Sequence, residues 1–410
     1  MHVFLRNKIF YGWFVAGAGF LISVFGLGAR YSYGVFLKSI EADLGMTRAV
    51  TSSIFSVYML LGCLMAVLGG WCMDRYGPKK VGIIMGTFTG LSFILTSRVN
   101  SPWQLFITYS LLFSLGTGAV YVVANSTASR WFVRKRGLVV GFTSAGGGVG
   151  TLFIAPFAAF LISSYHWRTA FITLGFLTWV GIAAVSLLFK KDPRDIGLLP
   201  DGATSGSPDG DHQKKTGDAP RPGFSLGQAY RMSQFWLLGF SWAFLSLSMH
   251  LIFVHIVPYA IDTGISPMDA SFILSLIGIA NIMGRVTLGK LSDIVGRKPL
   301  AITCDLVQCV ALIWLMWARQ FWMLYAFSFA FGFTFGASST QITILVGDIF
   351  GTRSLGAIMG ILTAGFALGA AIGPAVGGFI FDVSGHYFMA FATGAIAMLL
   401  AAGAIAFIRK

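Results

Sequence analysis

The amino-acid sequence contains an internal repeat with an offset of 219 positions. Special residues fall on one another at this offset, without a gap, from residue 45 to residue 150 of the first copy. The pairs are Gly45 and Gly264, Gly70 and Gly289, Asp74 and Asp293, Gly77 and Gly296, Lys79 and Lys298, Gly137 and Gly356, Gly141 and Gly360, Gly146 and Gly365, and Gly150 and Gly369. Because an acid and a lysine keep the register of the glycines, chance matches among 51 glycines do not explain it. The chain is a duplicated unit, and each copy should hold the same elements.

Each copy contains long apolar runs. Hydrophobic residues make up 56% of the chain and charged residues 11%, against roughly 25% charged residues in soluble domains. About 20 helical residues cross the ~30 Å hydrocarbon core. Runs of that order lie at 10–37, 49–71, 80–98, 102–128, 137–163, 168–189, 233–260, 269–291, 299–318, 321–347, 355–381 and 387–408. Their lack of a two-residue period argues against a β-barrel. The sequence predicts an all-α membrane protein with twelve transmembrane helices in two pseudo-symmetric six-helix bundles.

The copies define two predicted domains, 1–190 and 231–410, joined by a cytoplasmic linker at 191–230. Gly, Ser, Pro, Asp and Lys dominate the linker, so it cannot bury an apolar core and should be flexible. His212 within it is expected to be a solvated side chain. The four cysteines have spacings that fit neither a metal site nor a disulfide framework, so we expect no metal and no cofactor.

Basic residues distinguish the two sides of the membrane. With the amino terminus inside, most of the 29 Lys and Arg residues fall in cytoplasmic segments. The outside receives Lys38, Arg48, Arg98, Arg168 and Arg319. This asymmetry follows the positive-inside rule, so both termini are predicted to be cytoplasmic. The lipid bilayer therefore explains the net charge of +14, and no nucleic-acid partner is needed.

One loop motif occurs at equivalent places in the two copies. The first loop carries Gly70, Asp74, Arg75 and Gly77, and the second carries Gly289, Asp293, Gly296 and Arg297. Glycine allows two helices to approach closely, and an aspartate at a helix end can pair with a basic residue or a helix N-terminus. Two ordinary basic loops would explain the charges but not the repeated spacing. The motif resembles the hallmark loop of the major facilitator superfamily, which implies gating contacts in an alternating-access transporter.

Charged side chains inside the predicted membrane spans mark the candidate site, because such groups are costly and usually face a cavity. Arg285 has no acid three or four residues before or after it. A guanidinium without a partner on its own helix can bind a carboxylate through two parallel hydrogen bonds. Pairing with an acid on another helix, or extension of the side chain to the membrane surface, are the alternatives. Arg30 is a second candidate, with extension to the outer surface as its alternative.

Further candidates are aromatic, amide and imidazole side chains. His250 and His255 are about 140° apart on one helix, so they cannot share a face. His255 precedes Pro258 by three residues, and a histidine titrates near neutral pH, which suits a proton carrier. Tyr121 and Asn125 share a helix face. Phe335 and Phe366 either line the substrate pocket or pack in the core.

A closer resemblance covers both copies. The segments around Tyr11-Gly12-Trp13, Tyr31 to Phe36, Phe253 to Gly264 and Arg130 to Phe142 resemble the monocarboxylate transporter family and its bacterial members, and the related oxalate–formate antiporters. The resemblance implies that Arg285 binds substrate, that His255 is the helix histidine of bacterial members, and that Tyr121 is a binding-site tyrosine.

The chain also departs from these families. Asn281 stands where animal monocarboxylate transporters have an acid, and Tyr31 stands where they have an essential lysine. Gly365 stands where the dicarboxylate antiporter has its second cation. The resemblance then implies one carboxylate on the substrate, unless Arg30 supplies the missing charge, and a proton path that uses His255 and Arg285.

We therefore expect a secondary active transporter of small monocarboxylates such as lactate or pyruvate, coupled to H+ and functioning as a monomer. Carboxylate exchange of the oxalate–formate type, and transport of another organic solute, are the alternatives. An enzyme is not expected, because the sequence shows no nucleophile beside a base and no phosphate-binding glycine loop. Cation transport would need acids inside the membrane, and Asp305 and Asp348 are the near candidates.

Overall fold

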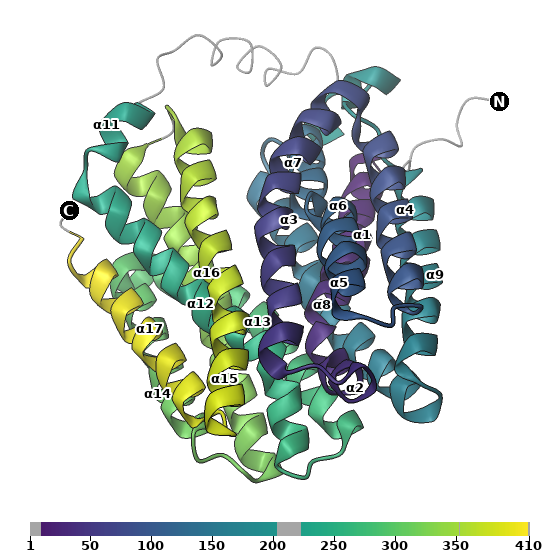
Figure 1. Ribbon diagram of the computed structural model, residues 1–410. Helices are drawn as coiled ribbons and strands as arrows, with labels where there is room; N and C mark the ends of the chain where they lie inside the picture. The colour runs from purple at the N-terminus through teal and green to yellow at the C-terminus, as the bar shows by residue number, and fades with distance from the viewer. Residues whose placement is uncertain (1–9, 203–222, 352, 409–410) are drawn as a thin grey trace.

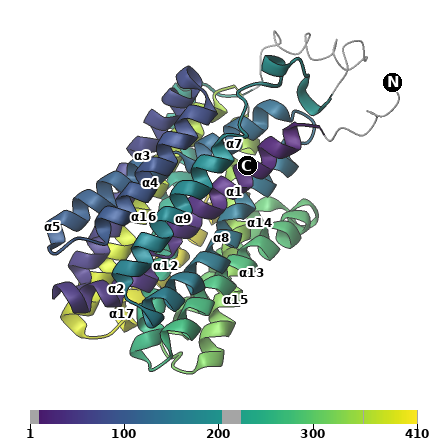
Figure 2. The same cartoon turned by 90° about the vertical axis from the view of Figure 1, so that its right-hand side faces the viewer.

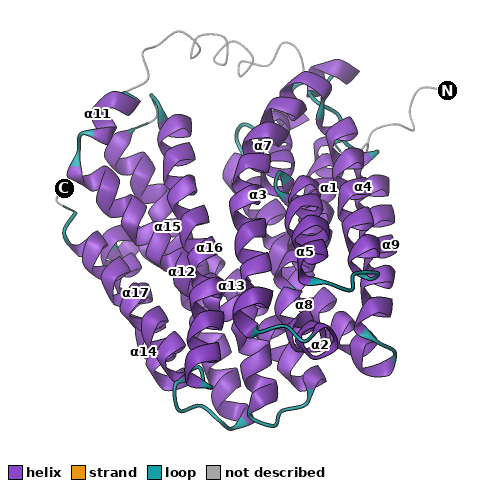
Figure 3. Ribbon diagram, viewed as in Figure 1, coloured by secondary structure: helices purple, strands orange, loops and turns teal. Residues whose placement is uncertain are grey.

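The computed structural model describes residues 10–202, 223–351 and 353–408. All elements named in these ranges are helices joined by short loops (Figure 3). The middle of the predicted linker, with His212, lies outside the described residues. Its described ends hold the turns η2 (Pro193–Ile196) and η3 (Pro200–Gly202) and the short helix α11 (Leu226–Tyr230).

The helices form two halves, which Figure 1 shows side by side. The N-terminal half contains α1 (Gly12–Tyr31), α2 (Tyr33–Leu44), α3 (Arg48–Tyr76), α4 (Pro78–Thr96), α5 (Pro102–Leu105), the π-helical segment η1 (Phe106–Leu112), α6 (Phe113–Thr117), α7 (Val120–Trp131), α8 (Arg136–Ser164) and α9 (Trp167–Ser186). The C-terminal half contains α12 (Ser233–Asp262), α13 (Pro267–Val295), α14 (Arg297–Leu315), α15 (Phe321–Phe350), α16 (Leu355–Ser384) and α17 (Phe388–Ala406).

Within the described ranges, 11 helical segments are long and apolar enough to cross a membrane. Two are composite: α1 with α2 over Gly12–Leu44, and α5 to α7 over Pro102–Trp131. The remaining long helix, α4, is not among these 11 segments. It begins with a proline and two lysines, which lower its mean hydropathy, and it packs along α9. The predicted all-α class with two six-helix halves is confirmed. The run predicted to end at residue 37 continues to Leu44, where Gly45 ends the helix with a φ of 61°.

The sequence repeat reappears in the helix bounds. Shifted by the repeat offset, α3 has the bounds of α13, and α4 has the bounds of α14. The two halves are therefore built from the same helical unit. Both copies of the loop motif join these helices, and Gly77 and Gly296 sit at the joints with φ values of 84° and 95°. Because this backbone conformation strains any residue with a Cβ, glycine is required there.

The helices run roughly along one direction (Figure 2). We call the end that carries η2, η3 and α11 the linker end, and the end that carries loops 45–47, 263–266 and 385–387 the opposite end. The ribbons of the two halves diverge toward the linker end (Figure 1).

Backbone contacts between the halves involve glycines from the middle of the helices to the opposite end. A Cβ added to Gly34 of α2 would lie 2.7 Å from the Val254 carbonyl oxygen of α12. A Cβ on Gly148 of α8 would lie 2.8 Å from the Gly278 carbonyl oxygen of α13. Gly378 of α16 packs in the same way against α3. These glycines let the backbones of opposite halves touch, which closes that end.

The loop motif makes ion pairs within each half. Asp74 of α3 accepts a hydrogen bond from Arg130 of α7 at 2.6 Å, and Arg297 of α14 pairs with Asp348 of α15. The close helix approach expected at the first glycine of each loop is not found in this conformation. An added Cβ at Gly289 would have no neighbouring atom within 4 Å, and one at Gly70 would be 3.5 Å from the nearest.

Gly369→Val tests the packing of α16 on α12. A Cβ at this position would lie 2.0 Å from the Ala243 carbonyl oxygen, and overpacking typically costs about 1–3 kcal/mol. We expect a lower thermal unfolding midpoint in detergent. Gly360→Val on the same helix is the matched control, because an added Cβ there has no neighbour within 4 Å. Equal midpoints for the two variants would contradict the packing described here.

Candidate functional site

Arg285 is a half-buried cation on α13. Its Nε atom is buried and has no hydrogen-bond partner among the described residues. The sequence left open an ion pair between Arg285 and an acid on another helix. No such ion pair occurs among the described residues. A buried donor without a hydrogen-bond partner lowers the stability of the fold by about 1–3 kcal/mol, and a charged donor lowers it by more. The site therefore favours binding of an anion.

Arg30 on α1 lies in a different environment. Its Nε donates to the Tyr58 hydroxyl at 2.6 Å, and its Nη2 donates to the Thr117 carbonyl at 3.4 Å. The guanidinium also lies over the Tyr58 ring at 5.4 Å. The side chain points to α3 and α6, so the alternative of extension to the outer membrane surface is wrong. Its hydrogen bonds are with neutral groups, which leave its charge uncompensated.

Tyr31 lies within electrostatic range of both arginines. Its hydroxyl is close enough to both Arg30 and Arg285 to interact with them electrostatically, and Tyr121 of α7 is in the same range. The Tyr31 ring contacts Phe253 of α12 with centroids 4.6 Å apart. The structure thus brings Arg30, Tyr31, Tyr121 and Arg285 to one region between the halves, which we call the central cluster.

The remaining substrate candidates differ in what they contact. Asn125 accepts a hydrogen bond from Thr143 of α8 at 2.7 Å through its side-chain oxygen. Phe366 is half-buried and lies 5.7 Å from the ring of His250. Phe335 is 5% exposed and stacks within the aromatic core of α15. Phe366 therefore adjoins the central cluster, while Phe335 and Asn125 have partners in their own halves.

His255 lies away from the central cluster, near the opposite end. It is 0% exposed, and its Nε2 is 2.9 Å from the Pro374 carbonyl oxygen of α16. Its Nδ1 is 3.0 Å from the Tyr387 hydroxyl, and Ser52 of α3 is 3.4 Å from Nε2. A role of His255 in direct substrate contact is not supported in this conformation. Its place between α3, α12 and α16 instead links it to the contact between the halves.

His250 is the histidine that adjoins the central cluster. It is 1% exposed, and its ring centroid is 6.5 Å from that of Tyr31. Its Nδ1 is 2.9 Å from the Ser246 carbonyl, and its Nε2 has no partner among the described residues. The helical angle between the histidines showed that only one could face the site, but the angle could not show which one.

A group of ion pairs joins the halves at the opposite end, which the sequence analysis did not predict. Arg48 of α3 donates to Asp262 of α12 at 2.8 Å and to Glu41 of α2 at 2.9 Å. Lys38 of α2 donates to Asp262 at 2.6 Å. We call Lys38, Glu41, Arg48 and Asp262 the inter-half ion cluster. The side chain of Arg48 is 7% exposed. The carboxylates of Glu41 and Asp262 compensate its buried charge.

Two further groups complete this closure. Asp382 of α16 accepts from the backbone N–H groups of Arg48 and Ala49 at the start of α3, at 3.0 and 2.8 Å. A carboxylate at a helix N-terminus is stabilised by its N–H groups and dipole. The Tyr387 hydroxyl accepts from Arg48 at 3.0 Å. Burial raises the pKa of Tyr387, so its hydroxyl remains protonated and can also donate to His255.

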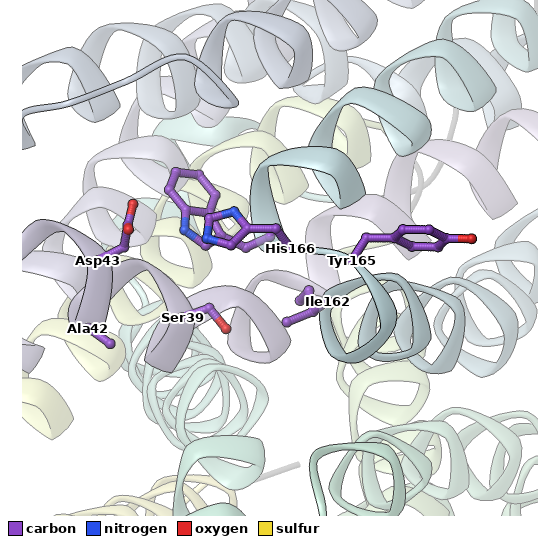
Figure 4. Close-up of a pocket in the computed structure, with 7 residues that line it drawn as sticks. Ser39, Ala42, Asp43, Ile162, Tyr165 and His166 are labelled. Carbon is purple, nitrogen blue, oxygen red and sulfur yellow. The ribbon is translucent and has the colours of Figure 1, made fainter.

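A pocket of about 340 Å³ lies on the surface at the opposite end (Figure 4). Its lining comes from α2, with Ser39 and Asp43, and from the junction of α8 and α9, with Tyr165 and His166. No member of the central cluster lines it, so it is not the place where Arg285 would bind an anion. Among the described residues, no three His, Cys, Asp or Glu side chains are grouped to hold a metal ion.

Comparison with known proteins places both halves in one family. The sequence profile of the Major Facilitator Superfamily matches residues 19–286 and 237–410. Monocarboxylate transporter 12 of Mus musculus is 27% identical over 418 residues, covering 97% of this chain and 85% of the relative. Monocarboxylate transporter 13 of Bos taurus is 25% identical, covering 96% and 88%. The uncharacterized MFS-type transporter YhjX of Escherichia coli (strain K12) is 24% identical, covering 86% and 84%.

Asp262→Asn tests the inter-half ion cluster. The change removes the ion pairs to Lys38 and Arg48, and a loss of about 1 kcal/mol would raise the open fraction of the opposite end about fivefold. We expect correspondingly faster maleimide labelling of Ser56→Cys, which is buried on the α3 face that carries Ser52. The measurement uses detergent-solubilised protein whose four native cysteines are replaced by serine.

Asp43→Asn is the control for this experiment, because Asp43 pairs with Arg168 inside the N-terminal half. Its labelling rate should match that of the parent. A rate for Asp262→Asn equal to the parent rate would show that the cluster does not hold the opposite end closed.

Proposed function

The chain belongs to the Major Facilitator Superfamily, and we propose that it carries small monocarboxylates, such as lactate or pyruvate, across the membrane by alternating access. The observation that carries the proposal is the buried Nε of Arg285, which has no hydrogen-bond partner among the described residues, on a helix of a multi-pass membrane protein. A planar guanidinium matches a carboxylate with two parallel hydrogen bonds. The names of the similar mammalian proteins agree with this substrate class.

The number of free cations favours one carboxylate on the substrate. Arg30 is held by Tyr58 and Thr117, whereas Arg285 has an unused donor. Arg30 contributes to the positive potential of the central cluster, so it favours an anion without direct contact. The substrate is surrounded by Tyr31, Tyr121 and Phe366. The side chains of Asn125 and Phe335 stabilise their own helices. The proposed transport needs no cofactor.

The direction of access follows from charge. The linker end carries basic residues on its loops and helix ends, namely Arg75, Lys79, Lys80, Arg134 and Arg136. From the positive-inside rule we infer that this end lies in the cytoplasm of a bacterium. The inter-half ion cluster then closes the periplasmic side, and the halves separate toward the cytoplasm. The loop-motif pairs Asp74–Arg130 and Arg297–Asp348 hold each half together in this state, and the protein acts as a monomer.

Arg285→Lys tests the substrate site. Lysine keeps the charge but loses the planar pair of donors, so transport should fall at least about tenfold, the effect of ~1.4 kcal/mol. The measurement is counterflow of labelled L-lactate in proteoliposomes, with equal amounts of inserted protein. Arg319→Lys, at an exposed arginine outside the spans, is the control and should transport at the parent rate.

A panel of unlabelled mono- and dicarboxylates in the same assay separates the candidate functions. Competition by monocarboxylates alone supports the proposed class. If oxalate or another dicarboxylate competes better, the exchanger of the oxalate–formate type is favoured. Parent-like transport by Arg285→Lys would remove this arginine from the site.

His255 connects protonation with opening of the periplasmic side. A carbonyl only accepts, so Nε2 must donate to Pro374, and neutral Nδ1 then accepts from Tyr387. Protonated His255 would offer a second donor to a tyrosine oxygen that already accepts from Arg48. Burial disfavours its charged form most, the charge of Arg48 does so as well, and the carboxylate of Asp382 opposes them. Neutral His255 therefore favours closure, and protonation favours opening toward the periplasm.

His255→Gln tests this link, because glutamine can donate to Pro374 and accept from Tyr387 as neutral histidine does. Labelling of Ser56→Cys should be faster at about pH 4.5 than at about pH 7.5 in the parent, because a buried imidazole is protonated only in more acidic solution, and this difference should vanish in the variant. Exposed Ser163→Cys in the same background corrects for the pH dependence of the reagent. An unchanged pH effect in His255→Gln would exclude the histidine from the coupling.

A further inference from the structure

A buried carboxylic acid lies in the C-terminal half, behind the central cluster. Asp305 of α14 is 0% exposed, and Ser338 of α15 donates to its Oδ1 at 2.7 Å. Gln308, one turn along α14, donates from Nε2 to the same serine oxygen at 3.2 Å. The serine hydroxyl therefore joins the two side chains into one polar group inside an apolar half.

The unused atoms of this group show which form of Asp305 fits. Asp305 Oδ2 and Gln308 Oε1 are both buried and have no hydrogen-bond partner among the described residues. An ionised Asp305 leaves both of these acceptors without a donor. Protonation of Oδ2 creates a donor in this network, which can serve the Gln308 oxygen one helical turn away. The conformation thus fits the protonated acid.

No cation compensates a negative charge at this place in the described residues. The charged groups of the helices packed against α14 are Asp269, Arg285, Lys290 and Asp293 of α13 and Asp348 of α15, and α17 carries none. On α14 itself, Arg297 pairs with Asp348, and Lys298 donates to the carbonyls of Ala406 and Ile408. The adjacent residue on α14, Cys304, carries a thiol and no cation. An uncompensated carboxylate here would be costly.

The acid is mechanically connected to the arginine. Gly284, the residue before Arg285, packs its backbone on α15: an added Cβ would lie 1.8 Å from the Phe333 carbonyl oxygen. Gly336, two residues before Ser338, packs equally closely on the Asn281 backbone, with 2.2 Å from an added Cβ to the carbonyl oxygen. Because α13 and α15 touch backbone to backbone, a movement of α13 would also displace the helix that holds Ser338 against Asp305.

We propose that Asp305 is the group that carries the transported proton: it binds H+ together with the substrate anion and releases H+ when the anion leaves. This inference rests on the proposed proton-coupled transport. Because the α13–α15 contact links Arg285 to the helix that holds Ser338, anion binding and protonation of Asp305 favour each other in this proposal. His255 controls opening of the periplasmic side, and Asp305 holds the proton during passage.

Asp305→Asn tests the proposal, because asparagine imitates the protonated acid in size, in its acceptor for Ser338 and in its donor for Gln308. In proteoliposomes without a pH gradient, L-lactate counterflow should stay within about twofold of the parent. Accumulation of L-lactate driven by an alkaline interior should be lost. Asp43→Asn, a surface carboxyl, should accumulate L-lactate as the parent does. Parent-like accumulation by Asp305→Asn would overturn the proposal.

Ser338→Ala gives a second test that does not depend on removal of the acid. It deletes the donor that stabilises the ionised form, so the pH dependence of L-lactate uptake should shift to higher pH. An unshifted profile, or accumulation driven by a sodium gradient at equal pH, would contradict a proton site at Asp305. If the parent itself shows no L-lactate counterflow, the proposed function fails instead, which is a distinguishable result.

Discussion

A positive charge without a negative partner, held inside a membrane-spanning bundle, is the constraint on which this molecule depends. Arg285 is half-buried on α13 and keeps an unused donor. Burying such a group reduces stability unless something compensates it. Tyr31 and the second arginine, Arg30, lie near it, and no carboxylate among the described residues forms an ion pair with it. Our proposal is that the substrate supplies this carboxylate.

The two halves make such a site usable because they touch at one end and separate toward the other. Glycine contacts bring the backbones of opposite halves together at Gly34, Gly148 and Gly378. The inter-half ion cluster and Asp382 add polar contacts that can be broken without unfolding either half. By contrast, the loop-motif pairs lie inside single halves. Each half can thus move as a unit, and closure at the opposite end is a reversible association.

Much of the fold follows from sequence pattern. The repeat offset predicts equal helix bounds, and α3 and α13 agree residue by residue. Apolar length predicts most helix ends closely, but α2 extends the first helix to Leu44, and α3 and α13 continue to Tyr76 and Val295, past the predicted ends at 71 and 291. The site was only partly predictable. The lack of an acid near Arg285 can be read along one helix, but the partners of Arg30 and Arg48 come from other helices. Helical angles also cannot show that His250, and not His255, faces the central cluster.

The most direct measurement of the central claim is a density map of the protein with a bound monocarboxylate. The account predicts the carboxylate of L-lactate within hydrogen-bond distance of the Arg285 guanidinium, with Tyr31 and Tyr121 beside the ligand. A carboxylate bound to Arg30 or elsewhere, with the Arg285 guanidinium paired to an acid of the protein, would contradict it.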